Sequence, residues 1–179
     1  MIIIDYNGIA IANIMVQKLA IDENVIRHMI LNSIRMYRKR FGKEYGEVVL
    51  CSDAGGNWRK ELFPQYKASR KKTRAKSSMN WEEVFRITSM VREEIRENFP
   101  YKVMHIEGCE ADDCIAIATK HLINTMENVK ITIITADHDY MQLIDEDTEI
   151  FTLKYKPLRT KKNSTYDTHE IIPHVNDGS

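Results

Sequence analysis

Short apolar runs, separated by segments with helical spacing, constrain the fold of this chain most strongly. The runs cover residues 2–4, 48–51, 102–106 and 130–135, and a fifth covers 149–153. They are rich in Ile and Val and too short for helices, so each is predicted to be a buried strand. Strands that alternate with helices indicate an α/β fold of three layers, in which helices cover both faces of a mostly parallel sheet.

The segments between these runs favour helices. One is expected over about residues 9–20, and a second spans residues 26–37 and ends near Gly42. Further helices are expected over 84–95, closed by Pro100, over 111–122 and, briefly, over 140–144. Residues 62–80 lack an apolar stripe, so this basic stretch is predicted to be a mobile loop or short helices.

Acidic residues follow the predicted strands. The carboxyl ends of parallel strands meet at one edge of a sheet, where ligands bind in such folds. Seven carboxylates are expected there: Asp5, Asp53, Glu110, Asp112, Asp113, Asp137 and Asp139. Helix capping explains Asp5, Asp53 or Asp113, each taken alone, equally well. Seven on one rim exceed what capping requires.

Such crowded carboxylates repel one another unless divalent cations neutralise them. Their hard oxygens suit Mg²⁺ or Mn²⁺, and two ions about 3.5–4 Å apart support hydrolysis of a phosphodiester. This chemistry requires no serine, cysteine or histidine nucleophile. His138 is expected to be a bystander, and Gly55-Gly56 a turn rather than a phosphate-binding loop.

The net charge of zero hides a separation of signs. Between residues 62 and 81 there are basic residues and no acid: Lys67, Arg70, Lys71, Lys72, Arg74 and Lys76. A second basic stretch holds Lys154, Lys156, Arg159, Lys161 and Lys162. A solvated surface explains each run alone, but together with the acidic rim they favour a polyanionic ligand such as nucleic acid.

The remaining composition limits the setting of the protein. No apolar run approaches the roughly 18 residues of a membrane span, so no membrane partner is expected. The amino end lacks a basic region before its apolar stretch, and three scattered cysteines suit a reducing compartment, so a cytoplasmic location is expected. Cys109 and Cys114 are expected to be small apolar fillers.

Residues 58–70 mix aromatic and basic side chains. Trp58 and Phe63 are expected to belong to the core. Tyr66, Lys67 and Arg70 are better explained by nucleic acid, because aromatic rings stack on unpaired bases and cations hold phosphates.

Taken together, these motifs resemble the flap endonuclease and 5′-nuclease superfamily, and within it the ribonucleases H of T-even-like bacteriophages. The matching residues are Asp5, Asp53, Tyr66-Lys67-x-x-Arg70, Glu110-Ala-Asp112-Asp113 and Asp137-x-Asp139. The resemblance implies one PIN-like catalytic domain over residues 1–179, in which 62–80 form an arch-like basic loop. It also implies a metal-dependent 5′-to-3′ exonuclease and flap endonuclease with RNase H activity, which removes RNA primers and flaps during replication.

The resemblance also assigns roles to residues. Asp5, Asp53, Glu110 and Asp112 would hold one ion, and Asp113, Asp137 and Asp139 the second. Lys67 and Arg70 would be catalytic at the scissile phosphate, and Tyr66 would stack on a terminal base. The expected nucleic-acid surface comprises Arg59, Tyr66, Lys67, Arg70, Lys71, Lys72 and Arg74. Expected partners are DNA and RNA–DNA hybrids with a free 5′ end, and single-strand-binding or clamp proteins of replication.

One departure and two alternatives remain. The family continues into a Gly-Asp-x-x-Asp-Asn motif within a helix–three-turn–helix element, which is absent from these 179 residues. A weakly held second ion, weaker duplex binding and impaired activity are therefore expected. A PIN-type single-strand ribonuclease and a non-catalytic nucleic-acid-binding fragment are the alternatives, and the preference for RNA or DNA stays open.

Overall fold

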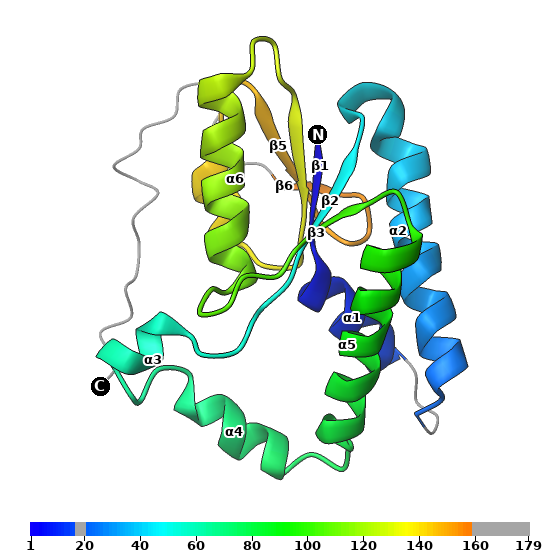
Figure 1. Cartoon of the computed structure of the whole chain (residues 1–179), viewed down its shortest axis with the longest axis vertical. Coiled ribbons are helices and arrows are strands. Elements are labelled where there is room, and N and C mark those ends of the chain that lie inside the picture. Colours follow the sequence, from blue (N-terminus) through cyan, green and yellow to red (C-terminus); the bar gives the residue numbers. More distant parts are fainter. Residues whose placement is uncertain (17–20, 159–179) are drawn as a thin grey trace.

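The computed structural model describes residues 1–16 and 21–158, and a twisted sheet lies at its centre (Figure 1). The strand order is β3-β2-β1-β4-β5-β6. The strands are β1 (Ile2–Asp5), β2 (Val48–Cys51), β3 (Lys102–Met104), β4 (Ile131–Ile134), β5 (Thr148–Phe151) and β6 (Pro157–Leu158). Strands β1 to β5 pair in parallel, and β6 pairs antiparallel to β5. The predicted mostly parallel sheet is therefore confirmed.

Helices cover both faces of this sheet. They are α1 (Tyr6–Val16), α2 (Glu23–Tyr45), α3 (Trp58–Leu62), α4 (Ala68–Ala75), α5 (Trp81–Asn98), α6 (Ala111–Thr125) and the 3₁₀ helix η1 (Asp139–Leu143). Helices α1, α2 and α5 pack on one face, and α6 with η1 packs on the other. This arrangement confirms the three-layer α/β architecture. Among the described helices, none has the length and hydropathy that a bilayer crossing requires.

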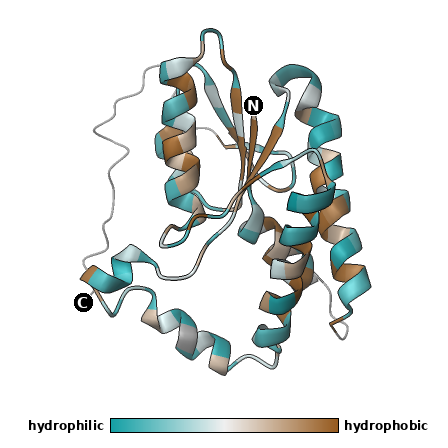
Figure 2. Ribbon diagram, in the orientation of Figure 1, coloured by the Kyte–Doolittle hydropathy of each residue, from teal (hydrophilic) through white to brown (hydrophobic). Residues whose placement is uncertain are grey.

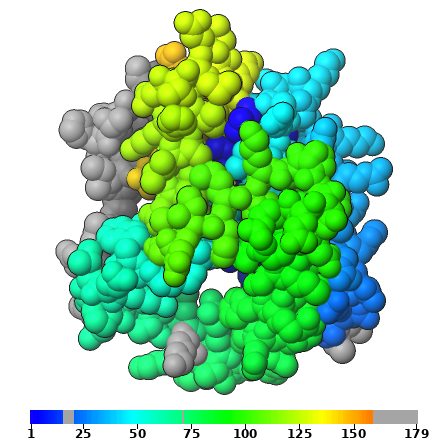
Figure 3. Space-filling view, in the orientation of Figure 1, coloured from blue at the N-terminus to red at the C-terminus, as the bar shows by residue number. Residues whose placement is uncertain are grey.

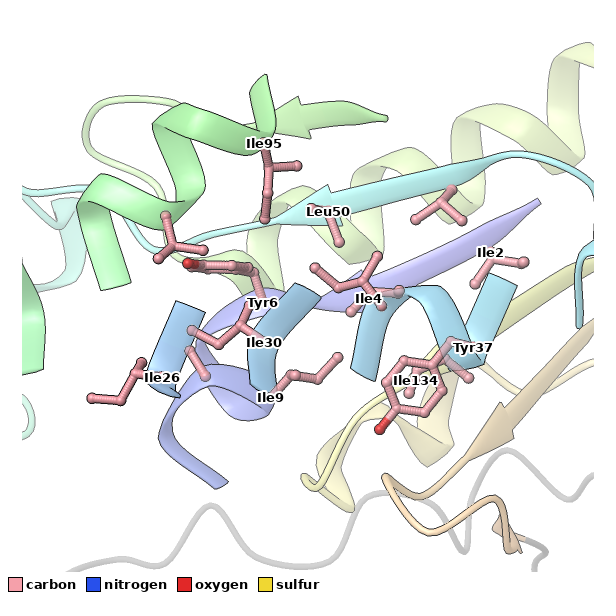
Figure 4. Close-up of a cluster of buried hydrophobic side chains, with 14 of the residues drawn as sticks. Ile2, Ile4, Tyr6, Ile9, Ile26, Ile30, Tyr37, Leu50, Ile95 and Ile134 are labelled. Carbon is pink, nitrogen blue, oxygen red and sulfur yellow. The ribbon is translucent and has the colours of Figure 1, made fainter. Parts of the chain in front are cut away.

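The alternation of strand side chains divides the core into two clusters. Ile2 and Ile4 point toward α1, α2 and α5, whereas Ile3 points toward α6, because successive side chains of a strand face opposite ways. All three are fully buried. Figure 4 shows the first cluster, in which Ile30 of α2 meets the sheet. In Figure 2 the central strands are brown and the outer helix surfaces mostly teal, as this packing requires.

Several boundaries differ from the predicted ones. Helix α1 begins at Tyr6, directly after β1, and α2 continues past Gly42 to Tyr45. The α2 helix ends at Gly46, whose φ of 85° and ψ of −123° suit glycine alone. Strand β3 ends at Met104 rather than residue 106, and the short strand β6 was not predicted. Residues 157–158 form a strand because they pair with β5, and no local sequence pattern predicts this strand.

Within the basic stretch of residues 62–80 lies the short helix α4, and the short helix α3 ends at its first residue, so the prediction of short helices is confirmed. We call residues 58–75 the α3–α4 segment. Trp58 and Phe63 were expected in the core, but this expectation was wrong, because they are 45% and 56% exposed. The segment lies away from the sheet, so its aromatic rings have no core to enter (Figure 1). Figure 3 shows an opening above this segment, with α5 to its right.

Candidate metal centre and nucleic-acid interface

The carboxyl edge of the sheet gathers acidic residues from four strand ends. Asp5 is the last residue of β1 and pairs in register with Cys51 of β2. Asp53 follows β2 by two residues, and Asp137 follows β4 by three. Glu110 is the N-cap of α6, after the loop that leaves β3. The topology therefore brings these distant positions to one edge, as expected.

Asp5, the last residue of β1, is a partly buried carboxylate with two hydrogen-bond donors. Its Oδ1 accepts a hydrogen bond from the Gly8 amide at 2.9 Å, and its Oδ2 accepts one from Thr135 Oγ1 at 3.1 Å. Burial above all, with a smaller contribution from the negative charges of Asp53 and Asp112, raises the pKa of Asp5 to about 6. The three carboxylates are thus close enough to repel one another through space.

Asp53 and Asp112 are held by separate hydrogen bonds. The Ala111 amide donates to Asp53 Oδ1 at 2.8 Å, which ties the loop after β2 to the start of α6. The Tyr140 hydroxyl, on η1, donates to Asp112 Oδ1. Burial raises the pKa of Asp112, and the charges of Asp53 and Glu110 add to that rise.

Glu110 is buried and carries two partners from the α3–α4 segment. Lys67 Nζ lies 2.7 Å from Oε1, and the Tyr66 hydroxyl donates to Oε2 at 2.9 Å. Burial alone would raise the pKa of Glu110, but these two donors lower it. Lys67 has a φ of 54°, a left-handed backbone that a residue with a side chain rarely adopts. Strained backbone of this kind concentrates at functional sites.

The charged partner of Asp113 is Arg59 of α3. The guanidinium donates from Nη2 to Oδ1 at 2.7 Å and from Nη1 to Oδ2 at 2.9 Å. The hydrogen bond from Arg59 holds the pKa of Asp113 below its usual value. Arg59 Nη1 also lies 3.4 Å from Glu110 Oε2. Both residues of this pair were predicted for other roles, Arg59 for nucleic acid and Asp113 for a metal.

Asp137 and Asp139 lie at the exposed side of the edge. Asp137 Oδ1 accepts a hydrogen bond from the Asp139 amide at 2.9 Å, which starts η1. Burial raises the pKa of Tyr140, and the charges of Asp5, Asp112 and Asp137 contribute. Asp137 is thus close enough to Tyr140 for its charge to act on the same hydroxyl as the charges of Asp5 and Asp112. His138, also exposed, remains a bystander only by prediction.

The donor chemistry of this edge fits a hard divalent cation. Mg²⁺ or Mn²⁺ would neutralise the carboxylates of this edge, two of which, Asp5 and Asp112, have a raised pKa. Within residues 1–16 and 21–158, however, no group of three His, Cys, Asp or Glu side chains is arranged to hold an ion. Lys67 and Tyr66 occupy the Glu110 oxygens in this arrangement.

The structure describes only some of the basic side chains of the two predicted basic stretches. Arg70, Lys72 and Arg74 lie exposed on α4. Arg74 extends over the rings of Trp81 and Phe85, at 5.5 and 4.9 Å from their centroids. The Lys71 side chain and residues Arg159, Lys161 and Lys162 lie outside the described part of the structure, whereas Lys154 and Lys156 are exposed.

Two residues at this edge were not predicted. Tyr140 holds Asp112, and Thr135 holds Asp5 while its Oγ1 accepts from the Asp137 amide at 3.0 Å. Thr135 directly follows β4 and is the last residue of the predicted run 130–135, so a polar residue at that end was an available signal. The sequence does not mark Tyr140 as a site residue, because an aromatic side chain also fits the short helix predicted over residues 140–144.

A family model assigns this arrangement to a known class. The model of the 5′-3′ exonuclease, N-terminal resolvase-like domain, matches residues 2–176. The chain belongs to this family.

Curated relatives support the same assignment. A ribonuclease H from Enterobacteria phage T4 is 37% identical over 147 residues, 79% of this chain and 48% of the relative. A 5′-3′ exonuclease from Buchnera aphidicola subsp. Acyrthosiphon pisum is 32% identical over 125 residues, 70% of this chain and 37% of the relative. The chain therefore spans under half the length of these relatives.

Solved structures share the fold. T5 5′-exonuclease with bound divalent metal ions (zinc) has a TM-score of 0.69 at 19% identity, over 88% of this chain and 57% of that one. A bacteriophage T5 flap endonuclease in a pseudo-enzyme-product complex with DNA and metal ions has a TM-score of 0.68 at 19% identity, over 87% and 56%. At this identity the likeness establishes the three-layer fold alone.

Proposed function

We propose that this chain is the catalytic domain of a divalent-metal-dependent 5′ nuclease that hydrolyses phosphodiesters in nucleic acid with a free 5′ end. One observation carries the proposal: Lys67 and Tyr66 of the basic α3–α4 segment rest on Glu110 at the acidic edge. A phosphate held by this segment would therefore reach the carboxylates. Membership of the 5′-3′ exonuclease family supports the same reading.

Mg²⁺ or Mn²⁺ would supply charge neutralisation and activation of water at this edge. Asp5, Asp53, Glu110 and Asp112 would hold a first ion, and Asp137 and Asp139 would serve a second, weaker one. The mutual repulsion of Asp5, Asp53 and Asp112 supports this division, because it links the three electrostatically.

The side chains of the α3–α4 segment would handle the substrate. Lys67 is close enough to the edge to move from Glu110 to a phosphate oxygen, and Arg70 follows it on α4. Tyr66 presents an aromatic ring beside them, on which a terminal base would stack. Lys71 and Lys72 would add attraction for the phosphate backbone, which carries no sequence information. The opening above the segment would admit a single strand (Figure 3).

Two cleavage assays test this function. A 5′-labelled flap, as DNA and as an RNA–DNA hybrid, should be cut with Mg²⁺ and left intact with a chelator. Blocking the 5′ end with a bulky group should then slow cutting strongly, because the strand must enter from a free end. Cutting that ignores the block would indicate a PIN-type single-strand nuclease. Binding without any cutting would refute the catalytic proposal.

Replication proteins are the partners we propose for this domain. Relatives named ribonuclease H and 5′-3′ exonuclease support a role in removing RNA primers and flaps. Single-strand-binding protein or a clamp would meet such a nuclease on the lagging strand. Stimulation of flap cleavage by purified single-strand-binding protein tests this pairing.

A further inference from the structure

Helix α3 has little apolar contact to hold it in place. None of its residues is buried; Trp58 and Leu62 are 45% and 78% exposed, and Phe63, which follows the helix, is 56% exposed. A helix of this length is not stable by itself in water. Polar contacts at its start must therefore position it.

One such contact, beside the hydrogen bond from the Trp58 amide to the Gly108 carbonyl, is a fork-shaped ion pair between Arg59 of α3 and Asp113 of α6. Two parallel hydrogen bonds join them at 2.7 and 2.9 Å, and their side chains are only 27% and 16% exposed. The guanidinium lies 4.5 Å from the ring centroid of Trp58 and 5.9 Å from that of Tyr66. Arginine suits this geometry because its planar group pairs with a carboxylate and stacks on rings at once.

The Asp113 carboxylate accepts three hydrogen bonds at the join between α3 and α6. Besides the two Arg59 donors, its Oδ2 accepts the Glu110 amide at 3.0 Å, which completes a capping box at the start of α6. Both oxygens are thus committed to the join between α3 and α6. The carboxylates that repel one another across the edge are Asp5, Asp53 and Asp112.

A second arginine holds the other end of the segment. Arg74, near the end of α4, lies over Trp81 and Phe85 of α5. Tyr66 and Lys67, which contact Glu110, lie between the two arginines in the sequence. The segment therefore has an arginine contact near each end, and Tyr66 and Lys67 lie between these contacts.

We infer that Arg59 and Asp113 form an anchor that places Tyr66 and Lys67 at the acidic edge. Arg59 is a positioning residue rather than a phosphate-binding one, and Asp113 is its partner rather than a metal ligand. The inference rests on the proposed function only for its cleavage readout.

Hydrogen exchange of the full chain tests the anchor directly. Arg59→Ala should raise amide exchange in peptides covering residues 57–67 at least tenfold and leave α2 unchanged. Arg59→Lys keeps the charge without the fork and should give an intermediate rise. Arg86→Ala is the matched control, because it removes an exposed arginine that pairs with Glu23 and Glu83 on the surface. Unchanged exchange in Arg59→Ala would overturn the anchor.

Charge exchange separates an anchor from a metal ligand. Asp113→Arg alone should raise exchange in the same peptides, and the double variant R59D/D113R should recover most of the protection. Titration with Mg²⁺ alone, followed by calorimetry, should give dissociation constants for Arg59→Ala and the double variant no more than threefold above that of the parent. A tenfold loss of Mg²⁺ affinity in the double variant, with protection recovered, would make Asp113 a ligand and overturn its assignment.

Cleavage kinetics add a readout that a stability defect would not give. Arg59→Ala should lower kcat on a 5′ flap at least tenfold, with Mg²⁺ affinity retained, and the double variant should regain part of kcat. A rise in KM alone, with kcat unchanged, would make Arg59 a substrate-binding residue and overturn its assignment. If the parent chain cuts nothing, the proposed function fails, while exchange and metal titration still decide the anchor.

Discussion

Lys67 and Glu110 neutralise each other across the acidic edge, with Nζ 2.7 Å from Oε1. We assign one of them to the substrate phosphate and the other to a metal ion. While the two side chains are paired, Lys67 cannot bind a phosphate and the same oxygen of Glu110 cannot bind a metal ion. A cation that binds Glu110 would displace the Lys67 ammonium, which would then be free to meet a phosphate.

Removing the Lys67 ammonium should therefore tighten metal binding. Lys67→Met frees both a Glu110 oxygen and its charge, so the dissociation constant for Mg²⁺ should fall by about three- to tenfold. Cleavage should nevertheless be lost, because no cation then polarises the phosphate. Calorimetric titration measures the affinity. Lys60→Met, an exposed lysine of α3, is the matched control and should leave the affinity unchanged. Weaker Mg²⁺ binding in Lys67→Met would contradict competition for Glu110.

The burial of Asp5 should make stability depend on pH when no metal is bound. Its pKa of about 6 in the folded protein exceeds the ordinary 3.8, so the folded state binds this proton more tightly than the unfolded state does. The resulting stabilisation is complete below about pH 4 and is lost as the pH rises through 6. Asp5→Asn should accordingly raise the free energy of unfolding at pH 7.5 by about 3 kcal/mol and have little effect at pH 4.

Urea denaturation with a chelator, at both pH values, measures this difference. Glu127→Gln removes the same charge from an exposed loop at the opposite end of β4 and should change the free energy of unfolding by under about 0.5 kcal/mol. Mg²⁺ should raise the melting temperature of the parent more than that of Asp5→Asn. A variant that is less stable than the parent at pH 7.5 would show that Asp5 is not desolvated as described.

The sequence predicts the layers of this fold because its signals are local. Runs such as residues 2–4 and 48–51 are apolar throughout, and only a strand between two helical layers buries both of its faces. The gathering of Asp5, Asp53 and Glu110 at one edge follows from parallel topology alone. The hydrogen-bond partners at this edge do not follow from the topology. Arg59 meets Asp113, for example, because of the path that the chain takes between β2 and α6. Trp58 and Phe63 failed as core predictions for the same reason, since burial depends on where a helix lies.

Tyr140 should tune the metal site through Asp112. Its buried hydroxyl donates to Asp112 Oδ1, and Tyr140→Phe removes that donor but keeps the ring. Loss of a hydrogen bond that orients a ligand costs roughly tenfold or more in metal affinity or activity. The free energy of unfolding should fall by about 1 kcal/mol. Mg²⁺ titration and flap cleavage measure the first effect, and denaturation measures the second.

Tyr37→Phe is the matched control for Tyr140. The Tyr37 hydroxyl is also mostly buried and donates to the Leu153 carbonyl at 2.9 Å, on the α2 side of the sheet. Its removal should cost a similar stability with no change in Mg²⁺ affinity or cleavage. Equal losses of Mg²⁺ affinity in both variants would show that the effect of Tyr140 is a general loss of stability.

Two glycines of α2 should respond oppositely to alanine, and this distinguishes the true end of the helix from the predicted one. Gly42 lies inside α2, where an added methyl group would meet only Arg38 Cγ at 3.6 Å. Gly42→Ala should raise the free energy of unfolding by about 0.5–1 kcal/mol, because glycine weakens a helix interior. Gly46 has open space around it, but its φ of 85° and ψ of −123° strain any side chain. Gly46→Ala should therefore lower the free energy of unfolding by roughly 1–3 kcal/mol, although it creates no clash. Urea denaturation measures the free energy of unfolding of both variants. A stabilising Gly46→Ala would show that α2 does not end at this position.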